Sequence, residues 1–197
     1  AFGGGVSVGF LKSFERCHLG ASYISRQWME RFDDYPELAS SLDTPQQFQF
    51  GVAFEATPEV DLLLDYKFID WESVKAFSNE PTKGGLGWKN QSVISFGGRW
   101  RATEKLTFRG GLNYGKSPVD EEHIFANILT PVIMEWHVGT GASYKVNDHS
   151  VVHLTYQHTF RENKQESGSG GAFSQVGKGS KLSAKVDSIS LGYSYLF

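Results

Sequence analysis

The sequence predicts an all-β protein, specifically an antiparallel transmembrane β-barrel, and two observations lead to this fold class. The first is the run VDSISLGYSYLF over residues 186–197, in which large apolar side chains alternate with serine and glycine. Alternation of period two is typical of a strand with one apolar face and one polar face. The second is that short and long connections between such strands alternate along the whole chain, as they do in barrels that cross a membrane.

Composition sets limits on this interpretation. The 197 residues suffice for one domain or for part of a larger one, and a net charge of −3 offers no basic surface for nucleic acid. No apolar run reaches the roughly 18 residues of a membrane helix. The single cysteine, Cys17, excludes an intrachain disulfide framework and a cysteine-based metal site. A soluble antiparallel β-protein would have the same composition, so the pattern of residues must decide.

Reading the chain for alternation gives about nine predicted strands. They cover residues 4–13, 17–27, 46–55, 59–71, 90–101, 105–116, 134–146, 150–161 and 186–197. The connections at 14–15, 57–58, 103–104 and 147–148 are short, and those at 28–45, 72–89, 117–133 and 162–180 are long. Outer-membrane barrels have short turns on one side of the membrane and long loops on the other. A soluble sandwich or lipocalin has no physical reason to keep that order.

Aromatic residues gather where these strands end, which predicts two belts at the membrane interfaces. The belt next to the long connections would contain Tyr114, Trp71, Trp88, Trp136 and Phe160. The belt next to the short turns would contain Phe54, Trp100, Tyr144, Tyr195 and Phe197.

The strand count predicts that the chain is part of a larger barrel. If Phe197 ends a strand on the short-turn side, nine strands place Ala1 on the opposite side. Single-chain bacterial barrels have an even number of strands. We therefore expect residues 1–197 to form a single barrel domain that is the carboxy-terminal part of a longer barrel. The alternative is that residues 1–13 are not a strand, which leaves a complete eight-stranded barrel.

An ordered series of segments resembles a known family. The run from Gly87 to Asp148 contains a Gly-Trp before a strand, the arm LTFRGGLNYGKSPV and the strand HVGTGASY. Two further segments belong to this series: LGASYISR at 19–26 and QFGVAFEATPEVDLLLDYKFIDW at 49–71. Together they resemble the FadL/TodX (OmpP1) family of outer-membrane transporters for long-chain fatty acids and aromatic hydrocarbons.

The resemblance implies a fourteen-stranded barrel of the bacterial outer membrane with an amino-terminal plug. Nine strands would then be the last nine, and five further strands restore an even number. It also implies a monomer that takes up hydrophobic molecules, contacts outer-membrane lipid and is inserted by the barrel-assembly machinery through its carboxy-terminal strand. No ligand residue of the plug or of the first five strands can be carried over to this chain.

Apolar residues in two long connections are candidates for capturing a hydrophobic substrate. Residues of the first connection recur at helical spacing, which predicts a short amphipathic helix over the pore mouth. They are Trp28, Phe32, Tyr35, Ala39 and Leu42. A second group consists of Phe125, Ile128 and Leu129. In either place the alternative is that these side chains only pack the loop onto the barrel rim.

Charged residues on the lumen face form the third candidate group. They are Asp61, Asp65, Lys67, Arg99, Arg101 and Arg109. Arg99 or Arg109 would meet the carboxylate of a fatty acid through paired hydrogen bonds. The alternative, which we favour, is a ladder of opposite charges that stiffens the wall.

We expect no metal, no cofactor and no catalysis, because the six histidines lack ligand spacing and no nucleophile motif is present. The function predicted is passive uptake of hydrophobic molecules through an outer-membrane channel. Two alternatives remain: an adhesion or structural barrel that acts through its loops, and a lipase using His137 with Ser143, or His153 with a neighbouring serine.

Overall fold

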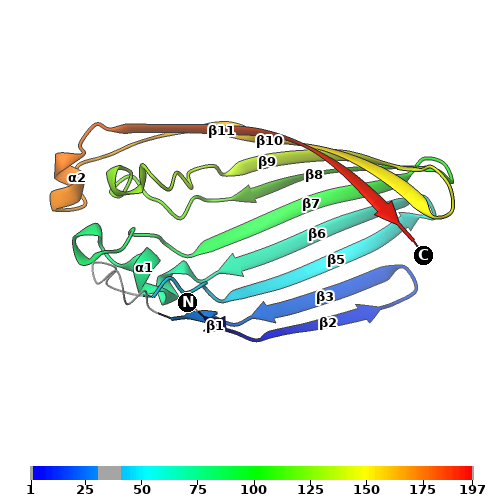
Figure 1. Cartoon of the computed structure of the whole chain (residues 1–197), viewed down its shortest axis with the longest axis horizontal. Coiled ribbons are helices and arrows are strands. Elements are labelled where there is room, and N and C mark those ends of the chain that lie inside the picture. Colours follow the sequence, from blue (N-terminus) through cyan, green and yellow to red (C-terminus); the bar gives the residue numbers. More distant parts are fainter. Residues whose placement is uncertain (1, 31–40, 197) are drawn as a thin grey trace.

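The computed structural model describes residues 2–30 and 41–196 and contains one curved antiparallel sheet of nine strands (Figure 1). The nine strands lie side by side in the order in which they occur along the chain, so each interior strand pairs with the sheet strands before and after it. The strands are β2 Ser7–Ser13, β3 Cys17–Ile24, β5 Gln47–Thr57, β6 Val60–Ile69, β7 Gln91–Arg101, β8 Leu106–Gly115, β9 Trp136–Lys145, β10 Ser150–Gln165 and β11 Lys181–Tyr195. The predicted number of strands and their antiparallel order are confirmed.

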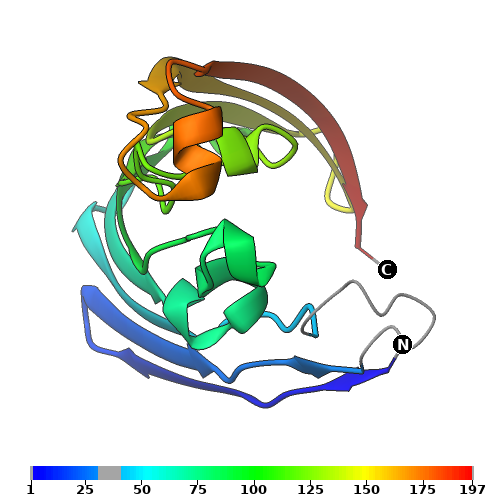
Figure 2. The ribbon, with the colours of Figure 1, turned by 90° about the vertical axis from the view of Figure 1, so that its left-hand side faces the viewer.

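Seen from its long-loop end, the sheet curls into an open trough (Figure 2). Its edges are β2 and β11, which do not pair with each other in the described residues. A separate two-stranded sheet joins β1 Gly3–Gly4 to β4 Trp28–Met29. The prediction that the first strand begins near Gly4 is therefore wrong, because Gly4 pairs with Trp28 in the small sheet and the strand of the large sheet starts at Ser7.

The convex face of the trough carries the large apolar side chains, and no other described segment of the chain covers them. Paired residues form continuous rows across the strands, such as Phe50, Tyr66 and Ile94. All three are about half exposed, and on β11 Leu191 is 78% exposed. A monomeric soluble protein rarely exposes an apolar surface of this extent. The face therefore requires a hydrocarbon environment.

The described parts of the long connections lie at one end of the sheet and the short turns at the other (Figure 1). Among the described residues, three of these connections contain short helices: η1 Trp71–Ser73, α1 Lys75–Ser78, η2 Pro81–Lys83, η3 Phe125–Asn127 and α2 Ala172–Val176. Within the described residues, no helix has the length and apolar character needed to cross a membrane.

The last two strands are longer than predicted. β10 continues to Gln165 and β11 already begins at Lys181. A β-bulge between Thr159 and Glu162 interrupts their pairing. Beyond it the convex-facing residues become polar, so the alternation that marks a lipid-facing strand disappears although the hydrogen-bonded ladder continues.

Two aromatic residues assigned to a membrane belt were placed wrongly. Trp88 is buried, and Trp71 packs edge-on against it in the interior of the long-loop end. Each lies just outside a strand, where the chain turns inward over the trough. The remaining described belt residues, such as Trp136 and Trp100, are about half exposed or stack on a convex-face neighbour. Phe197 lies outside the described residues.

The direction of the two faces can be tested on β11. Replacing Leu191 with lysine should destabilise the folded protein by about 2–4 kcal/mol, because a cation would enter the middle of the hydrocarbon layer. The neighbouring change Ser190→Lys points into the trough and should cost much less. The free energy of unfolding in urea, measured in lipid vesicles, checks both. Equal losses would show that the assignment of faces is wrong.

Candidate functional site: the trough and its cap

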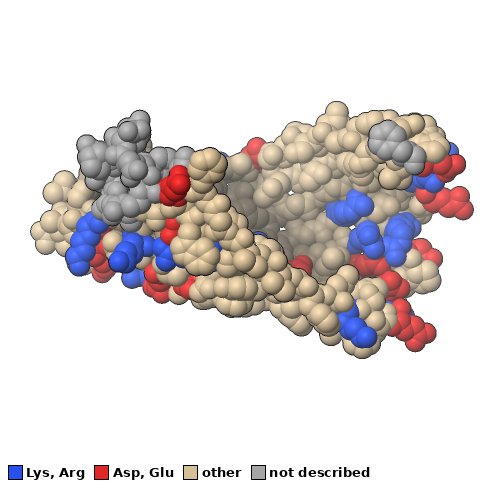
Figure 3. All heavy atoms as spheres, turned by 60° about the horizontal axis from the view of Figure 1, so that its bottom comes forward, with Lys and Arg blue, Asp and Glu red and all other residues tan. Residues whose placement is uncertain are grey.

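The concave face holds a pocket with a volume of about 740 Å³ (Figure 3), lined by residues of β3 and β5–β10. Its floor has almost no side chains, because Gly97, Gly111 and Gly139 face each other on β7, β8 and β9. Gly111 is required for a close approach: a Cβ there would lie 2.9 Å from the carbonyl oxygen of Phe96. The three glycines therefore leave space above the floor, and Gly111 also permits the close approach of two strands.

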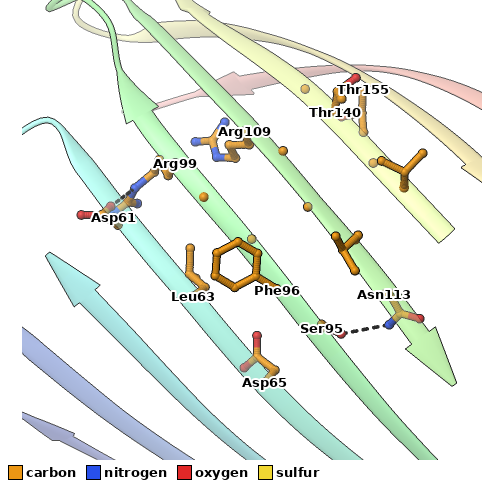
Figure 4. A pocket seen from close by; sticks show the side chains of 18 of the residues that line it. Asp61, Leu63, Asp65, Ser95, Phe96, Arg99, Arg109, Asn113, Thr140 and Thr155 are labelled. Atoms are coloured by element: carbon orange, nitrogen blue, oxygen red, sulfur yellow. Dashed lines mark hydrogen bonds and ion pairs between the residues drawn. The ribbon is translucent and has the colours of Figure 1, made fainter. Parts of the chain in front are cut away.

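The walls of the pocket mix apolar and neutral polar groups (Figure 4). Leu63 pairs with Gly97 and projects from the concave face, and the Asn113 amide donates to Ser95 Oγ over 2.9 Å. The Nδ1 atom of His137, buried beside the glycine floor, has no hydrogen-bond partner in the described part of the chain. The sequence analysis missed Leu63 and the glycine floor, although two Gly-Gly pairs on neighbouring predicted strands were a usable signal.

An ion-pair ladder lines the short-turn end of the pocket, where Figure 4 shows Asp61 and Arg99. Asp61, only 4% exposed, accepts hydrogen bonds from Arg99 Nε at 2.5 Å and from Arg101 Nη1 at 2.6 Å. A second bond joins Arg101 Nη2 to the other oxygen of Asp61 at 3.0 Å. Charges on adjacent strands therefore pair as predicted. One carboxylate here serves two guanidinium groups.

Arg109 stands apart from this ladder. It is paired in register with Arg99, so two cations lie side by side on β7 and β8. Its Nη1 donates to Ser143 Oγ at 2.5 Å, and it forms no salt bridge with a described residue. Like charges opposite each other on adjacent strands repel. An anion entering the pocket would relieve that repulsion at Arg109.

Ser143 and His153 form the polar contact predicted for a lipase, but the arrangement lacks a third member. Ser143 Oγ lies 2.8 Å from His153 Nδ1, and His153 Nε2 lies 3.2 Å from Ser194 Oγ. A catalytic triad needs a carboxylate at that second nitrogen to orient the ring and stabilise its charge. In this structure the pair holds the guanidinium of Arg109 in place. His137 and Ser143 do not contact each other through any hydrogen bond found here.

Three long connections, residues 70–90, 116–135 and 166–180, fold over the mouth of the trough (Figure 2). Together they form a packed cap. Trp88, Val119, Ile124 and Ile133 form its buried apolar centre. Fully buried Asn127 links two connections: its Oδ1 accepts from the Trp88 indole at 2.7 Å, and its amide donates to the carbonyl of Leu86 at 2.8 Å.

Buried charged groups join the parts of the cap. Glu166, 2% exposed, accepts from the Phe125 backbone at 2.9 Å and from Ser174 Oγ at 2.5 Å. His123 is buried between Asp120 Oδ1 at 2.5 Å and Glu80 Oε2 at 3.1 Å. The hydrogen bond to Asp120, with a smaller contribution from Glu80, outweighs burial and raises the pKa of His123 to about 9. The imidazolium therefore bridges two connections at neutral pH.

The predicted capture residues lie in two regions, the first long connection and the cap. Trp28 lies on β4 rather than on a helix and is 58% exposed, and Leu42 is 45% exposed. Phe32 and Tyr35 lie outside the described residues. In the cap, Phe125 packs against Phe173, while Ile128 and Leu129 are exposed, the latter by 93%. Val176 on α2, which the sequence analysis missed, is 79% exposed.

No group of three or more His, Cys, Asp or Glu residues in the described chain is arranged to hold a metal ion. Two candidate sites of another kind lie in the described residues: the pocket with its arginines and the apolar surface of the cap.

Comparison with known proteins gives one family. The sequence profile described as outer membrane protein transport protein (OMPP1/FadL/TodX) matches residues 16–197. Among curated protein sequences none matches.

Solved structures share the fold at low sequence identity. A FadL homologue from Pseudomonas aeruginosa superposes with a TM-score of 0.68 at 15% identity, over 97% of this chain and 52% of that one. The toluene transporter TodX of Pseudomonas putida gives 0.64 at 15% identity, over 98% and 49%. OmpT, an outer membrane protein of Vibrio cholerae, gives 0.56 at 12% identity, over 98% and 55%. This chain spans about half the length of these proteins.

The buried imidazolium predicts a pH-dependent cap. Because folding raises the pKa of His123 from 6.5 to about 9, its stabilisation is complete below pH 6.5 and is lost as pH rises through 9. Protection of cap amides against hydrogen exchange, corrected for the intrinsic rate, should therefore fall between these values. In His123→Gln this fall should disappear, and a wild-type cap equally protected at pH 6 and pH 9.5 would contradict the prediction.

Proposed function

Because this chain belongs to the outer-membrane protein transport family (OMPP1/FadL/TodX), we propose that it forms the substrate path of a passive channel for hydrophobic molecules with an anionic head. The single observation that carries this proposal is Arg109, a cation without a carboxylate partner in the described chain, beside a pocket floored by glycine. Long-chain fatty acids have this chemistry. Aromatic hydrocarbons would use the same pocket without the charged contact.

The open sheet supports a larger barrel. The edges of β2 and β11 present backbone groups that, in a membrane, need partners on further strands. We therefore propose that residues 1–197 are the carboxy-terminal part of a closed, monomeric barrel, with the long connections outside the cell. The exposed β11 would be the strand that the assembly machinery recognises.

The pocket suits an alkyl chain because an apolar stretch, made of Leu63 and the glycine floor, lies between Asp65 and the arginines. Leu63 and the glycine backbone offer apolar contact, and each Å² of apolar surface removed from water contributes roughly 25 cal/mol. The head of the ligand would lie at Arg109, where a charge-assisted hydrogen bond is about twice as strong as a neutral one. Hydrogen bonding through Ser143 and His153 would hold the guanidinium of Arg109 in position for this head group.

The apolar surface of the cap would capture substrate before it reaches the pocket. Leu129 and Val176 are almost fully exposed, beside Ile128 and Phe173. Apolar patches rimmed by polar residues often mark binding sites. Trp28 and Leu42 provide a second apolar surface near the mouth. A gradient from these weak surfaces to the pocket needs no energy source, so uptake is passive.

Two other functions compete with this proposal. An adhesion barrel would act through its loops and would bind no ligand in the trough. A lipase would need His153 as a base, but the second nitrogen of His153 faces Ser194 rather than a carboxylate. Binding of a non-hydrolysable ligand inside the trough distinguishes the channel from both.

Substitution of Arg109 tests whether the substrate has an anionic head group. Arg109→Gln should weaken binding of a long-chain fatty acid about tenfold, which corresponds to the loss of one charge-assisted contact. Binding of the alcohol of the same chain length should change less than about twofold, since that head has no charge. Isothermal titration of the detergent-solubilised protein measures both.

The matched control is Lys67→Gln, which removes a lumen-facing cation outside this pocket. It should leave both affinities unchanged. If the two substitutions weakened fatty-acid binding equally, the trough would attract anions only through its overall charge, and Arg109 would not be the head-group contact.

The capture surface gives a second test. The double substitution Leu129→Ser and Val176→Ser should slow uptake of a hydrophobic substrate at low concentration at least about threefold, because it removes apolar area where the ligand first lands. Stability should hardly change, since both side chains are exposed. Uptake into liposomes measures the rate, with Thr82→Ala and Lys83→Ala on the same cap as the control. An unchanged rate would remove this surface from the path.

A further inference from the structure

The β-bulge on β10 creates a basic patch on the convex face. Two residues, Phe160 and Arg161, stand opposite Lys185, because pairing resumes only at Glu162 and Ala184. Arg161 Nη1 donates to Ser183 Oγ at 3.2 Å. Ser183 and Lys185 are two positions apart on β11 and so share a face. Two cations therefore lie next to each other on the same side of the sheet.

This is the face that meets the membrane. Going down β11 by steps of two from Lys185 leads to Asp187, Ile189 and Leu191, the last two exposed by 74% and 78%. Going up leads to Lys181 at the start of the strand, which is also exposed. Beside the patch, Phe160 belongs to the aromatic belt next to the long connections and packs edge-on against His158.

The patch has more positive than negative charge. Asp187 is its one described acidic group and already accepts from Tyr156 Oη and His158 Nδ1, each at 2.7 Å. Lys185 reaches its other oxygen at 3.3 Å. Within residues 2–30 and 41–196, neither Arg161 nor Lys181 forms a salt bridge. Like charges on opposite strands repel, so the site favours an external anion.

The height of the patch identifies the anion. Tyr195 lies in the aromatic belt next to the short turns. From there to Lys185, a strand tilted by about 40° rises about 25 Å along the membrane normal, at about 3.3 Å per residue. The apolar band of an outer-membrane barrel is also about 25 Å tall. Lys185 and Arg161 therefore lie where the hydrocarbon ends and the charged head groups of the outer leaflet begin.

We propose that Arg161, Lys185 and Lys181 on the convex face of β10 and β11 bind the phosphate groups of a phosphorylated glycolipid in the outer leaflet. The fork of Arg161 suits bidentate contact with a phosphate, and Lys185 adds a second charge from the facing strand. Asp187 holds Lys185 and His158 at the edge of the site. Acyl chains of the same lipid would lie along Ile189 and Leu191 below it.

The test titrates the full-length protein in detergent with lipid A, a diphosphorylated glucosamine lipid, and counts bound lipid by native mass spectrometry. The double variant R161Q/K185Q should bind at least about tenfold more weakly than wild type. The control K75Q/K83Q removes the same charge from the cap and should bind within about twofold of wild type. Heat-modified gel mobility shows that each variant is folded.

Lipid chemistry provides the second arm, which needs no variant. Wild type should bind lipid A with its phosphates removed at least about tenfold more weakly than lipid A itself. Equal binding of the two lipids, or equal loss in both double variants, would overturn the proposal. Displacement of lipid A by inorganic phosphate at an equal concentration would overturn the lipid assignment as well, because the acyl chains would then contribute nothing.

Discussion

The structure depends on one constraint: the convex face of the sheet is apolar, and nothing in residues 2–30 and 41–196 covers it. Rows such as Phe50, Tyr66 and Ile94 are stable only against hydrocarbon. Within hydrocarbon every backbone N–H and C=O must find its partner on a neighbouring strand, since no water is available. Sequential antiparallel pairing satisfies this requirement for each interior strand. The polar residues must then turn to the concave side, and the trough follows.

Because the concave side is wet, its contents could be selected for a ligand rather than for packing. Glycine at 97, 111 and 139 removes side chains where the pocket lies. The ladder around Asp61 uses buried charges only where they are paired, which limits the cost of removing them from water. Arg109 is the exception. Its contacts are to a hydroxyl, so its charge remains available to an anion entering the trough.

The two ends of the trough differ in how the chain reverses direction. At the short turns, chain reversal needs few residues and leaves an open end. At the long-loop end, the connections form their own apolar centre around Trp88 and Ile124, with Asn127 and Glu166 satisfying buried backbone groups. Leu129 and Val176 do not belong to that centre and are exposed.

The sequence by itself determined the nine strands, their alternating faces and the order of short and long connections. These features are local, since a period of two is set by the pleat of a single strand. Family membership also followed from the residues, and the profile match confirmed it. The pairing of Asp61 with Arg99 could be predicted because neighbouring strands in a meander must be in register. What the tertiary structure alone decided involves contacts between distant segments. Trp71 and Trp88 turn inward because residues of two connections and of β11 pack together there. Arg109 has no carboxylate partner among the described residues because Asp61 pairs with Arg99 and Arg101. The bulge that places Arg161 opposite Lys185 gave no sign in the alternation, since a one-residue offset becomes visible only when two strands are paired.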